Sequence, residues 1–322
     1  MIERFRRARR ANAEPVRASA EAENTSATTF LDPATLARIS DLELLARTVV
    51  DGFINGLHRT PHLGVSLDFA EHRLYMPGDD TRRIDWRLYA RTDRFYLKEF
   101  EADTVMNFSI LLDVSSSMRY GSGAITKFDY ARFLAACLAY FAHGQRDRVG
   151  LVTFDADIVE VVPPSTKHLP ALLHAIARAK AVRPGNLHAP LSKLAEHFRR
   201  RSMVLLISDL YAKPDDVVDA VRHIRQNGND VMVVHILDPA ELDFPFDEAA
   251  PFEDLETGDK LSVVPSYLRD QYKTLVQTHI AELEARLGSQ GVDYSMFNTS
   301  QPLDYALFDF LSKRQQRIRA HS

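Results

Sequence analysis

The chain has 322 residues, of which 45% are hydrophobic and 26% charged, a composition typical of a globular protein and not of a disordered or fibrous one. The net charge of −4, with a pI near 6.3, provides no overall electrostatic attraction to nucleic acid or to an anionic membrane. The longest apolar run, residues 133–142, is about half the length that a bilayer span requires, so we expect no membrane span.

The N-terminal segment is rich in arginine. Six arginines and two glutamates occur in the first seventeen residues, and Ala, Ser, Thr and Glu dominate the following residues. Because no apolar segment follows the arginines, we expect a mobile tail over residues 1–35 and not a secretory signal. The single cysteine, Cys137, excludes a disulfide within the chain, which makes a reducing compartment, the cytoplasm, the expected location.

After residue 105, apolar runs typical of buried strands alternate with segments of helical periodicity. Strands are predicted at residues 106–113, 148–154, 158–162, 203–208, 231–237 and 294–297. Helices are predicted at residues 128–142, 169–181, 191–200, 215–226, 267–287 and 303–317. A polar hairpin is expected around Thr257-Gly258-Asp259. The predicted fold class is therefore α/β, with a doubly wound, mainly parallel sheet covered by helices on both faces.

The most informative segment is Ile-Leu-Leu-Asp-Val-Ser-Ser-Ser-Met at residues 110–118. Its apolar run predicts a buried strand that ends at Asp113 and is followed by a tight turn with Ser115 and Ser117. Oxygen-bearing side chains at positions i, i+2 and i+4 converge on one point, and a carboxylate with hydroxyl oxygens suits Mg²⁺ or Mn²⁺. The alternative is a turn whose Asp and Ser side chains only cap backbone amides.

A second apolar run, residues 203–208, also ends at an acidic residue, Asp209. In doubly wound sheets, ligands bind beyond the carboxyl ends of the strands, where the winding direction reverses. If the strands that end at Asp113 and Asp209 are neighbours, the two carboxylates face the same crevice. The sequence therefore predicts a metal site that includes both residues.

The pattern Asp113-x-Ser115-x-Ser117, with a later strand that ends at Ser208-Asp209, resembles the metal-ion-dependent adhesion site of von Willebrand factor A domains. The resemblance implies a Rossmann-type three-layer fold and one divalent cation, with Mg²⁺ favoured over Mn²⁺. It also implies a protein partner that presents an acidic residue to the open position of the metal. The family uses a Thr from a second loop, whereas the corresponding loop here, residues 184–187, offers the carbonyl oxygen of Asn186 or leaves the position to water.

A longer motif with irregular spacing lies upstream, at residues 69–92. It includes Arg73, Tyr75, Pro77, Gly78, Asp79, Asp80, Arg82, Asp85, Trp86 and Arg91. These residues closely resemble the signature of the bacterial family called domain of unknown function 58, whose members pair it with a von Willebrand A-like domain. Genes of that family commonly lie beside those of MoxR-type AAA+ ATPases, which implies a role in the assembly or remodelling of other proteins.

Three interpretations of this signature are open. The first is an internal ion-pair network that ties the segment to the main domain around Trp86. The second is a docking surface, because Trp, Tyr and Arg are enriched where interfaces concentrate binding energy. The third is a nucleic-acid surface, against which the interleaved acidic residues argue, so we expect no nucleic-acid partner.

Four regions follow from these patterns. They are the tail at residues 1–35, a smaller N-terminal signature subdomain at 36–104, a von Willebrand A-like domain at 105–300 and a C-terminal helix at 301–322.

The expected function is that of a metal-dependent protein–protein interaction module, an adaptor for a MoxR-type AAA+ ATPase. The alternatives are a phosphoesterase-like hydrolase that uses the same Asp and Ser residues, and a scaffold without metal. Because the common hydrolase, P-loop and zinc-protease motifs are absent from the sequence, no catalytic residue is assigned. Replacement of Asp113 or Asp209 by Ala is expected to leave folding intact and to weaken capture of the partner.

Overall fold

The computed structural model describes residues 8–10, 33–39, 41–59, 72–75, 86–98, 106–197, 202–248 and 250–321, which belong to two compact units. The smaller unit is Ile54–Val105, and the larger unit contains the rest of the chain. The sequence predicts that the N-terminal signature subdomain begins at residue 36, whereas the smaller unit begins at Ile54. The helix α3 (Leu42–Arg59) belongs to the larger unit up to Phe53, and its Leu45, Val49 and Phe53 are buried along one helical face.

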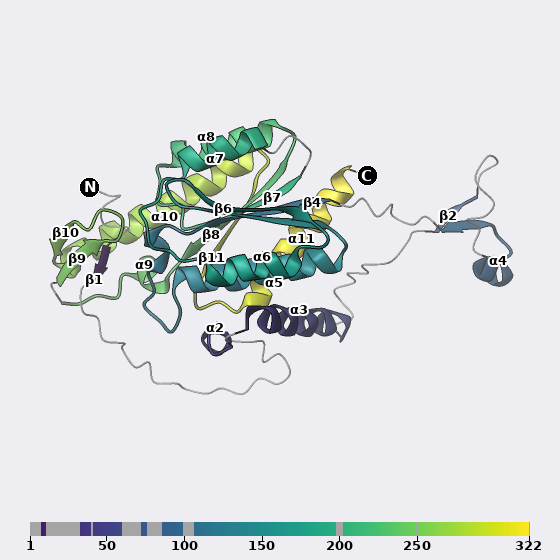
Figure 1. Ribbon diagram of the computed structural model, residues 1–322, viewed down its shortest axis with the longest axis horizontal. Helices are drawn as coiled ribbons and strands as arrows, with labels where there is room; N and C mark the ends of the chain where they lie inside the picture. The colour runs from purple at the N-terminus through teal and green to yellow at the C-terminus, as the bar shows by residue number, and fades with distance from the viewer. Residues whose placement is uncertain are drawn as a thin grey trace. The chain divides into compact units, whose positions relative to one another are not determined.

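A six-stranded sheet forms the centre of the larger unit (Figure 1). In the order β11-β8-β7-β4-β5-β6, its strands are β11 (Asp293–Asn298), β8 (Asp230–Leu237), β7 (Met203–Ser208), β4 (Asn107–Asp113), β5 (Arg148–Phe154) and β6 (Ile158–Ser165). Only the β5–β6 pair of this sheet is antiparallel. The predicted doubly wound, mainly parallel α/β fold is confirmed.

The winding direction of the sheet reverses between β4 and β7. The chain proceeds from β4 through β5 to β6 on one side, and from β7 through β8 to β11 on the other. The four central strands are buried along almost their whole length, which explains why they occur in the sequence as continuous apolar runs. The strand β6 lies at the edge and alternates in burial, and it continues through Pro163 and Pro164 because an edge strand tolerates proline.

Helices cover both faces of this sheet (Figure 1). On one face lie α7 (His188–His197), α8 (Pro214–Gln226) and α10 (Pro265–Ser289), and on the other α5 (Lys127–Gly144), α6 (Leu169–Arg178) and α11 (Leu303–His321). Phe310 of α11 packs against Phe108 of β4, with ring centroids 5.7 Å apart. The C-terminal helix, which we expected as a separate region, is therefore part of the larger unit.

Short elements complete this unit. They are α2 (Pro33–Leu36), the 3₁₀ turn η2 (Ser116–Arg119), α9 (Pro239–Asp243) and a small sheet of β9 (Ala250–Asp254), β10 (Lys260–Val263) and β1 (Ala8–Arg10). The antiparallel β9–β10 pair confirms the predicted hairpin, and Gly258 in its turn has a φ of 75°, which favours glycine. The strand β1 pairs with β9 although it lies in the segment expected to be a mobile tail.

The smaller unit contains α4 (Trp86–Thr92) and an antiparallel pair of strands, β2 (His72–Leu74) and β3 (Tyr96–Lys98).

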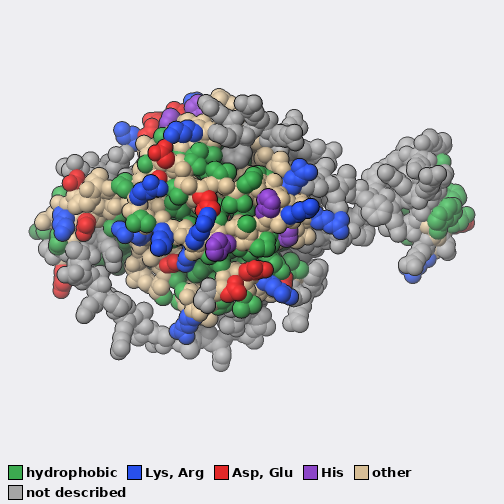
Figure 2. Space-filling view, in the orientation of Figure 1, with side chains coloured by type: hydrophobic (Ala, Val, Ile, Leu, Met, Phe, Trp, Pro, Cys, Tyr) green, Lys and Arg blue, Asp and Glu red, His purple; other side chains and the backbone are tan. Residues whose placement is uncertain are grey.

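No helix among the described residues of either unit combines the length and the apolar character that crossing a bilayer demands. On the face shown in Figure 2, Lys and Arg side chains are interspersed with acidic and hydrophobic ones.

Candidate functional site

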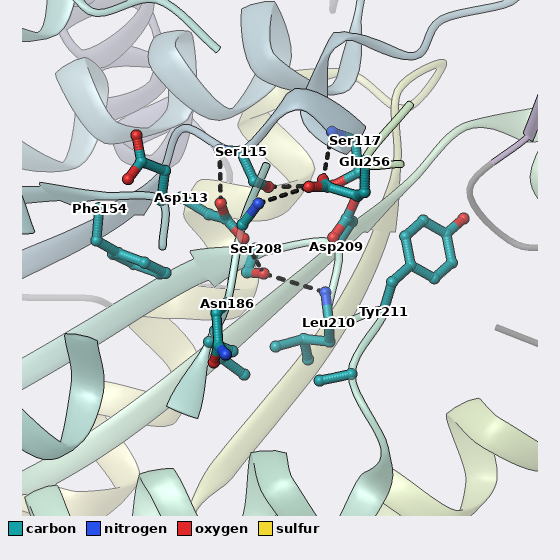
Figure 3. A pocket seen from close by; sticks show the side chains of 14 residues that line it. Asp113, Ser115, Ser117, Phe154, Asn186, Ser208, Asp209, Leu210, Tyr211 and Glu256 are labelled. Carbon is teal, nitrogen blue, oxygen red and sulfur yellow. Dashed lines mark hydrogen bonds between the residues drawn. The ribbon is translucent and has the colours of Figure 1, made fainter. Parts of the chain in front are cut away.

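The carboxyl ends of β4 and β7 meet where the winding reverses. The two strands are parallel neighbours, with Leu112 opposite Ile207, so their ends lie side by side. Asp113 is the last residue of β4 and Asp209 directly follows β7, and both line one cavity (Figure 3). The structure thus brings together the two acidic residues that the sequence places almost a hundred positions apart.

Hydrogen bonds define the turn after β4. One carboxylate oxygen of Asp113, Oδ1, accepts from the backbone N–H of Ser115 at 2.9 Å, and Oδ2 accepts from the Ser208 hydroxyl at 2.6 Å. The hydroxyls of Ser115 and Ser117 lie 3.1 Å apart, and both side chains are buried and line the same cavity. The turn therefore contains capping bonds and also presents three oxygen-bearing side chains to one point.

The cavity is small and its lining is acidic. Its volume is about 30 Å³, room for one or two water-sized groups. Burial, and then repulsion from Asp209, raise the pKa of Asp113 to about 7, so the two carboxylates are close enough to repel each other. Oxygen donors around such a cavity fit Mg²⁺ or Mn²⁺. Within the part of the chain that the structure describes, no three His, Cys, Asp or Glu side chains could hold a metal by themselves, so hydroxyls and water would complete its coordination.

A buried lysine neutralises one of the two carboxylates. Lys127, the first residue of α5, is fully buried and donates to Asp209 Oδ2 at 2.8 Å and to Glu241 Oε1 at 2.7 Å. The ring centroid of Tyr211 lies 4.4 Å from its Nζ. Burial lowers the pKa of Lys127, but attraction to Asp209 and Glu241 outweighs this effect and shifts the pKa upward. Because Lys127 does not line the cavity, it holds Asp209 without filling the space in front of Asp113.

Asn186 lines the cavity but its side chain has a different role from the expected one. Its Oδ1 accepts from the backbone N–H groups of His188 and Ala189 at 3.0 and 3.3 Å, in the first turn of α7. In Figure 3 the side chain points away from Ser115 and Ser117. The expected ligand is therefore corrected to a helix cap, because both acceptor positions of the amide oxygen are already used.

Gly185 makes a close approach to the turn after β4. A Cβ atom at this position would lie 2.4 Å from the Cβ of Ser115, and the neighbouring Arg183 carbonyl accepts from the N–H of Ser116 at 2.8 Å. We expect Gly185→Ala to lower the free energy of unfolding by about 1–3 kcal/mol in urea denaturation, because one of the two loops must shift. Gly123→Ala is the matched control, since no described residue other than its two chain neighbours has an atom within 4 Å of its Cβ position. Equal stability of the two variants would contradict the close packing.

Three contributors to the site were not assigned from the sequence. They are the hydroxyl of Ser208, the ammonium of Lys127 and the carboxylate of Glu256, which lines the cavity from the β9–β10 turn. Only Ser208 had a local signal, since it precedes Asp209 at the end of an apolar run.

Backbone strain is a further feature, because the buried Leu210 adopts a φ of 47° beside Asp209, a conformation that costs energy for a branched side chain.

Most of the upstream signature lies outside the described residues, namely Pro77, Gly78, Asp79, Asp80, Arg82 and Asp85. Arg73 is in β2, where the structure describes the backbone alone, and Arg91 is exposed at the end of α4. Four aromatic residues of the smaller unit cluster together. Tyr89 stacks on Phe95 with centroids 4.5 Å apart, and Tyr75 and Trp86 contact Phe95 edge to face. Trp86 remains 60% exposed, which leaves the docking interpretation open.

Comparisons with solved structures find similar chains at low sequence identity. One is the conserved hypothetical protein BatB from Bacteroides thetaiotaomicron, 16% identical with a TM-score of 0.44 over 66% of this chain and 99% of that chain. Another is an aerotolerance-related membrane protein from Bacteroides fragilis, 17% identical with a TM-score of 0.46 over 65% and 99%. A third is the SpRpn10 VWA domain, 14% identical with a TM-score of 0.39 over 63% and 94%. The doubly wound, mainly parallel α/β fold of the larger unit is established by its own strand order.

Sequence comparison identifies mycobacterial relatives. The uncharacterized proteins Rv1480 of Mycobacterium tuberculosis and Mb1516 of Mycobacterium bovis are each 28% identical over 292 residues, which cover 88% of this chain and 91% of theirs. A family model matches residues 71–282, a range that begins in the upstream signature and ends in α10. The chain therefore belongs to the family described as protein of unknown function DUF58.

Proposed function

We propose that this protein is a metal-dependent protein-interaction module that acts in the cytoplasm as an adaptor for a MoxR-type AAA+ ATPase. The observation that carries the proposal is the single cavity lined by Asp113, Ser115, Ser117 and Asp209 at the point where the sheet reverses its winding. A Mg²⁺ or Mn²⁺ ion held there would bind a carboxylate of the partner at its open position. The ATPase partnership rests on the resemblance of the upstream signature to a family whose genes neighbour those ATPases.

The charges around the cavity favour recognition over hydrolysis. Lys127 offsets the charge of Asp209. A divalent cation bound in the cavity would therefore keep a net positive charge and attract an incoming carboxylate. A hydrolase would need a general base next to the metal-bound water. Asp155 lines the cavity, but its carboxylate pairs with Arg183 at 2.9 Å, which disfavours that role. The hydrolase is therefore the second candidate, and a scaffold without metal is the third.

The direct test is a calorimetric titration of the full chain with Mg²⁺ and Mn²⁺, followed by capture of a purified MoxR-type ATPase with and without chelator. We expect one divalent cation to bind per chain and capture to fall at least tenfold in chelator. Absence of cation binding at millimolar concentration would favour the metal-free scaffold. Turnover of phosphate esters that requires the cation would favour the hydrolase.

A further inference from the structure

The tip of the β9–β10 hairpin reaches into the candidate metal site. Glu256 lies in the turn between the two strands and lines the cavity together with Asp113 and Asp209 (Figure 3). It is half-buried, and it comes from a segment 139 residues from the Ser117 turn that it contacts. The hairpin thus delivers an acidic side chain of the same chain to the place where a partner carboxylate is expected.

Two backbone amides bind this carboxylate. The N–H of Ser117 donates to Glu256 Oε1 at 2.8 Å, and the N–H of Gly185 donates to Oε2 at 2.5 Å. The two donors belong to different loops, one after β4 and one between α6 and α7. Hydrogen bonds from two N–H groups to the two oxygens of one carboxylate are charge-assisted and geometrically specific. Together, the two loops form a receptor for a carboxylate.

The rest of the hairpin separates into an anchored base and a tip with few contacts to the site. At the base, Phe252 and Val263 pack with Phe244 and Tyr272 in a small hydrophobic core. At the tip, apart from the Glu256 bonds, the Ser116 hydroxyl donates to the Leu255 carbonyl at 2.7 Å. The turn itself is held by its own backbone and by Asp254, which accepts from the N–H of Glu256 at 2.8 Å. Departure of the tip from the site would break three hydrogen bonds to it and leave the packing of the base intact.

We propose that the amides of Ser117 and Gly185 are the carboxylate-binding position of this site, that Glu256 occupies it in the resting protein, and that a partner binds by presenting an acidic residue that replaces Glu256. This inference deepens the proposed function and rests on it for the identity of the site. The partner segment is an acidic residue at the tip of a turn, the same chemistry as Leu255-Glu256-Thr257. A tethered carboxylate competes at a high effective concentration, so the chain suppresses weak acidic ligands.

The test uses a fluorescent peptide that copies residues 250–263 of this chain, titrated by anisotropy against the full-length protein in Mg²⁺. Glu256→Gln removes the internal charge with little change in size. We expect this variant to bind the peptide at least about tenfold more tightly than the wild type, because the internal competitor is weakened. Glu253→Gln is the matched control, since it makes the same change on β9 away from the cavity, and we expect it to bind like the wild type.

A second peptide, with Gln in place of the glutamate corresponding to Glu256, tests whether the carboxylate is recognised. We expect it to bind Glu256→Gln protein at least tenfold more weakly than the acidic peptide. Equal affinity of wild type and Glu256→Gln for the acidic peptide, equal affinity for both peptides, or no binding to Glu256→Gln would each overturn the inference. Calorimetry with Mg²⁺ on the same proteins separates the two proposals, because failure of cation binding overturns the proposed function whatever the peptides do.

Discussion

Replacement of Asp113 by Asn should abolish divalent-cation binding and at the same time stabilise the metal-free protein. Burial and repulsion from Asp209 raise the pKa of Asp113 from 3.8 to about 7, so the ionised form destabilises the folded state at neutral pH. Each pKa unit corresponds to about 1.4 kcal/mol. We expect a gain of about 1–2 kcal/mol at pH 8, less than the full shift, because Asn accepts the Ser208 hydroxyl less well than a carboxylate does.

The pH dependence has a definite sign. Since the folded-state pKa of Asp113 is raised, its contribution to stability is complete below pH 3.8 and is lost as the pH rises through about 7. In chelator, the advantage of Asp113→Asn over the wild type should therefore grow between pH 6.5 and pH 8. Urea denaturation at these two pH values, with and without Mg²⁺, measures the effect.

Cation binding reverses this order of stability. A ligand at one hundred times its dissociation constant stabilises a folded protein by about 2.7 kcal/mol. Mg²⁺ should stabilise the wild type and leave Asp113→Asn unchanged. Asp270→Asn, an exposed substitution on α10, is the control and should respond to Mg²⁺ like the wild type. An Asp113→Asn protein that still gains stability from Mg²⁺ would place the cation elsewhere.

Replacement of Lys127 by Met should destabilise the protein by about 3–5 kcal/mol, the cost of breaking a buried ion pair from one side. The Lys127 side chain is fully buried, and its ammonium pairs with the buried carboxylates of Asp209 and Glu241. Without it, both carboxylates are left in the interior with one less charged donor. The free energy of unfolding from urea denaturation at pH 7 measures the loss.

Lys193→Met is the matched control for this substitution. Lys193 pairs with Asp157 at 2.7 Å, but both side chains are more than half exposed, so the pair contributes at most about 1 kcal/mol. Comparable losses for the two lysines would show that the buried Lys127 pairs contribute no more to stability than an exposed pair does. A smaller loss for the double variant Lys127→Met/Glu241→Gln than for Lys127→Met would locate the cost in the unpaired carboxylates.

The same cluster leads us to expect different outcomes for two substitutions that the sequence treats alike. Replacement of Asp113 or Asp209 by Ala was expected to leave folding intact in both cases. Because Asp209 is a partner of the buried Lys127, its removal leaves a buried ammonium with one fewer carboxylate and should destabilise the protein. Among the described residues, the Asp113 carboxylate accepts hydrogen bonds from Ser115 and Ser208 and pairs with no cation, so it is the cleaner position for a test of metal binding.

The sequence alone determined the strands of the sheet and the residues at their ends. Strands buried on both faces require continuous apolar runs, and such a run can be recognised without knowledge of its neighbours. Residues 106–113 and 203–208 are runs of this kind, and each is followed or closed by an aspartate. The hairpin at Thr257-Gly258-Asp259 was also determined locally, because its turn needs a glycine with positive φ.

Only the tertiary structure decided which charges meet at those strand ends. Lys127 is 82 residues from Asp209 and 114 from Glu241, and Glu256 is 139 residues from Ser117. In the sequence, a lysine at the start of a helix and a glutamate in a polar turn look like ordinary surface residues. The pairing of Asp209 with Lys127, and of Glu256 with the Ser117 amide, joins segments that are far apart in the sequence. Because the strand order brings these segments together, no local sequence pattern encodes the contacts.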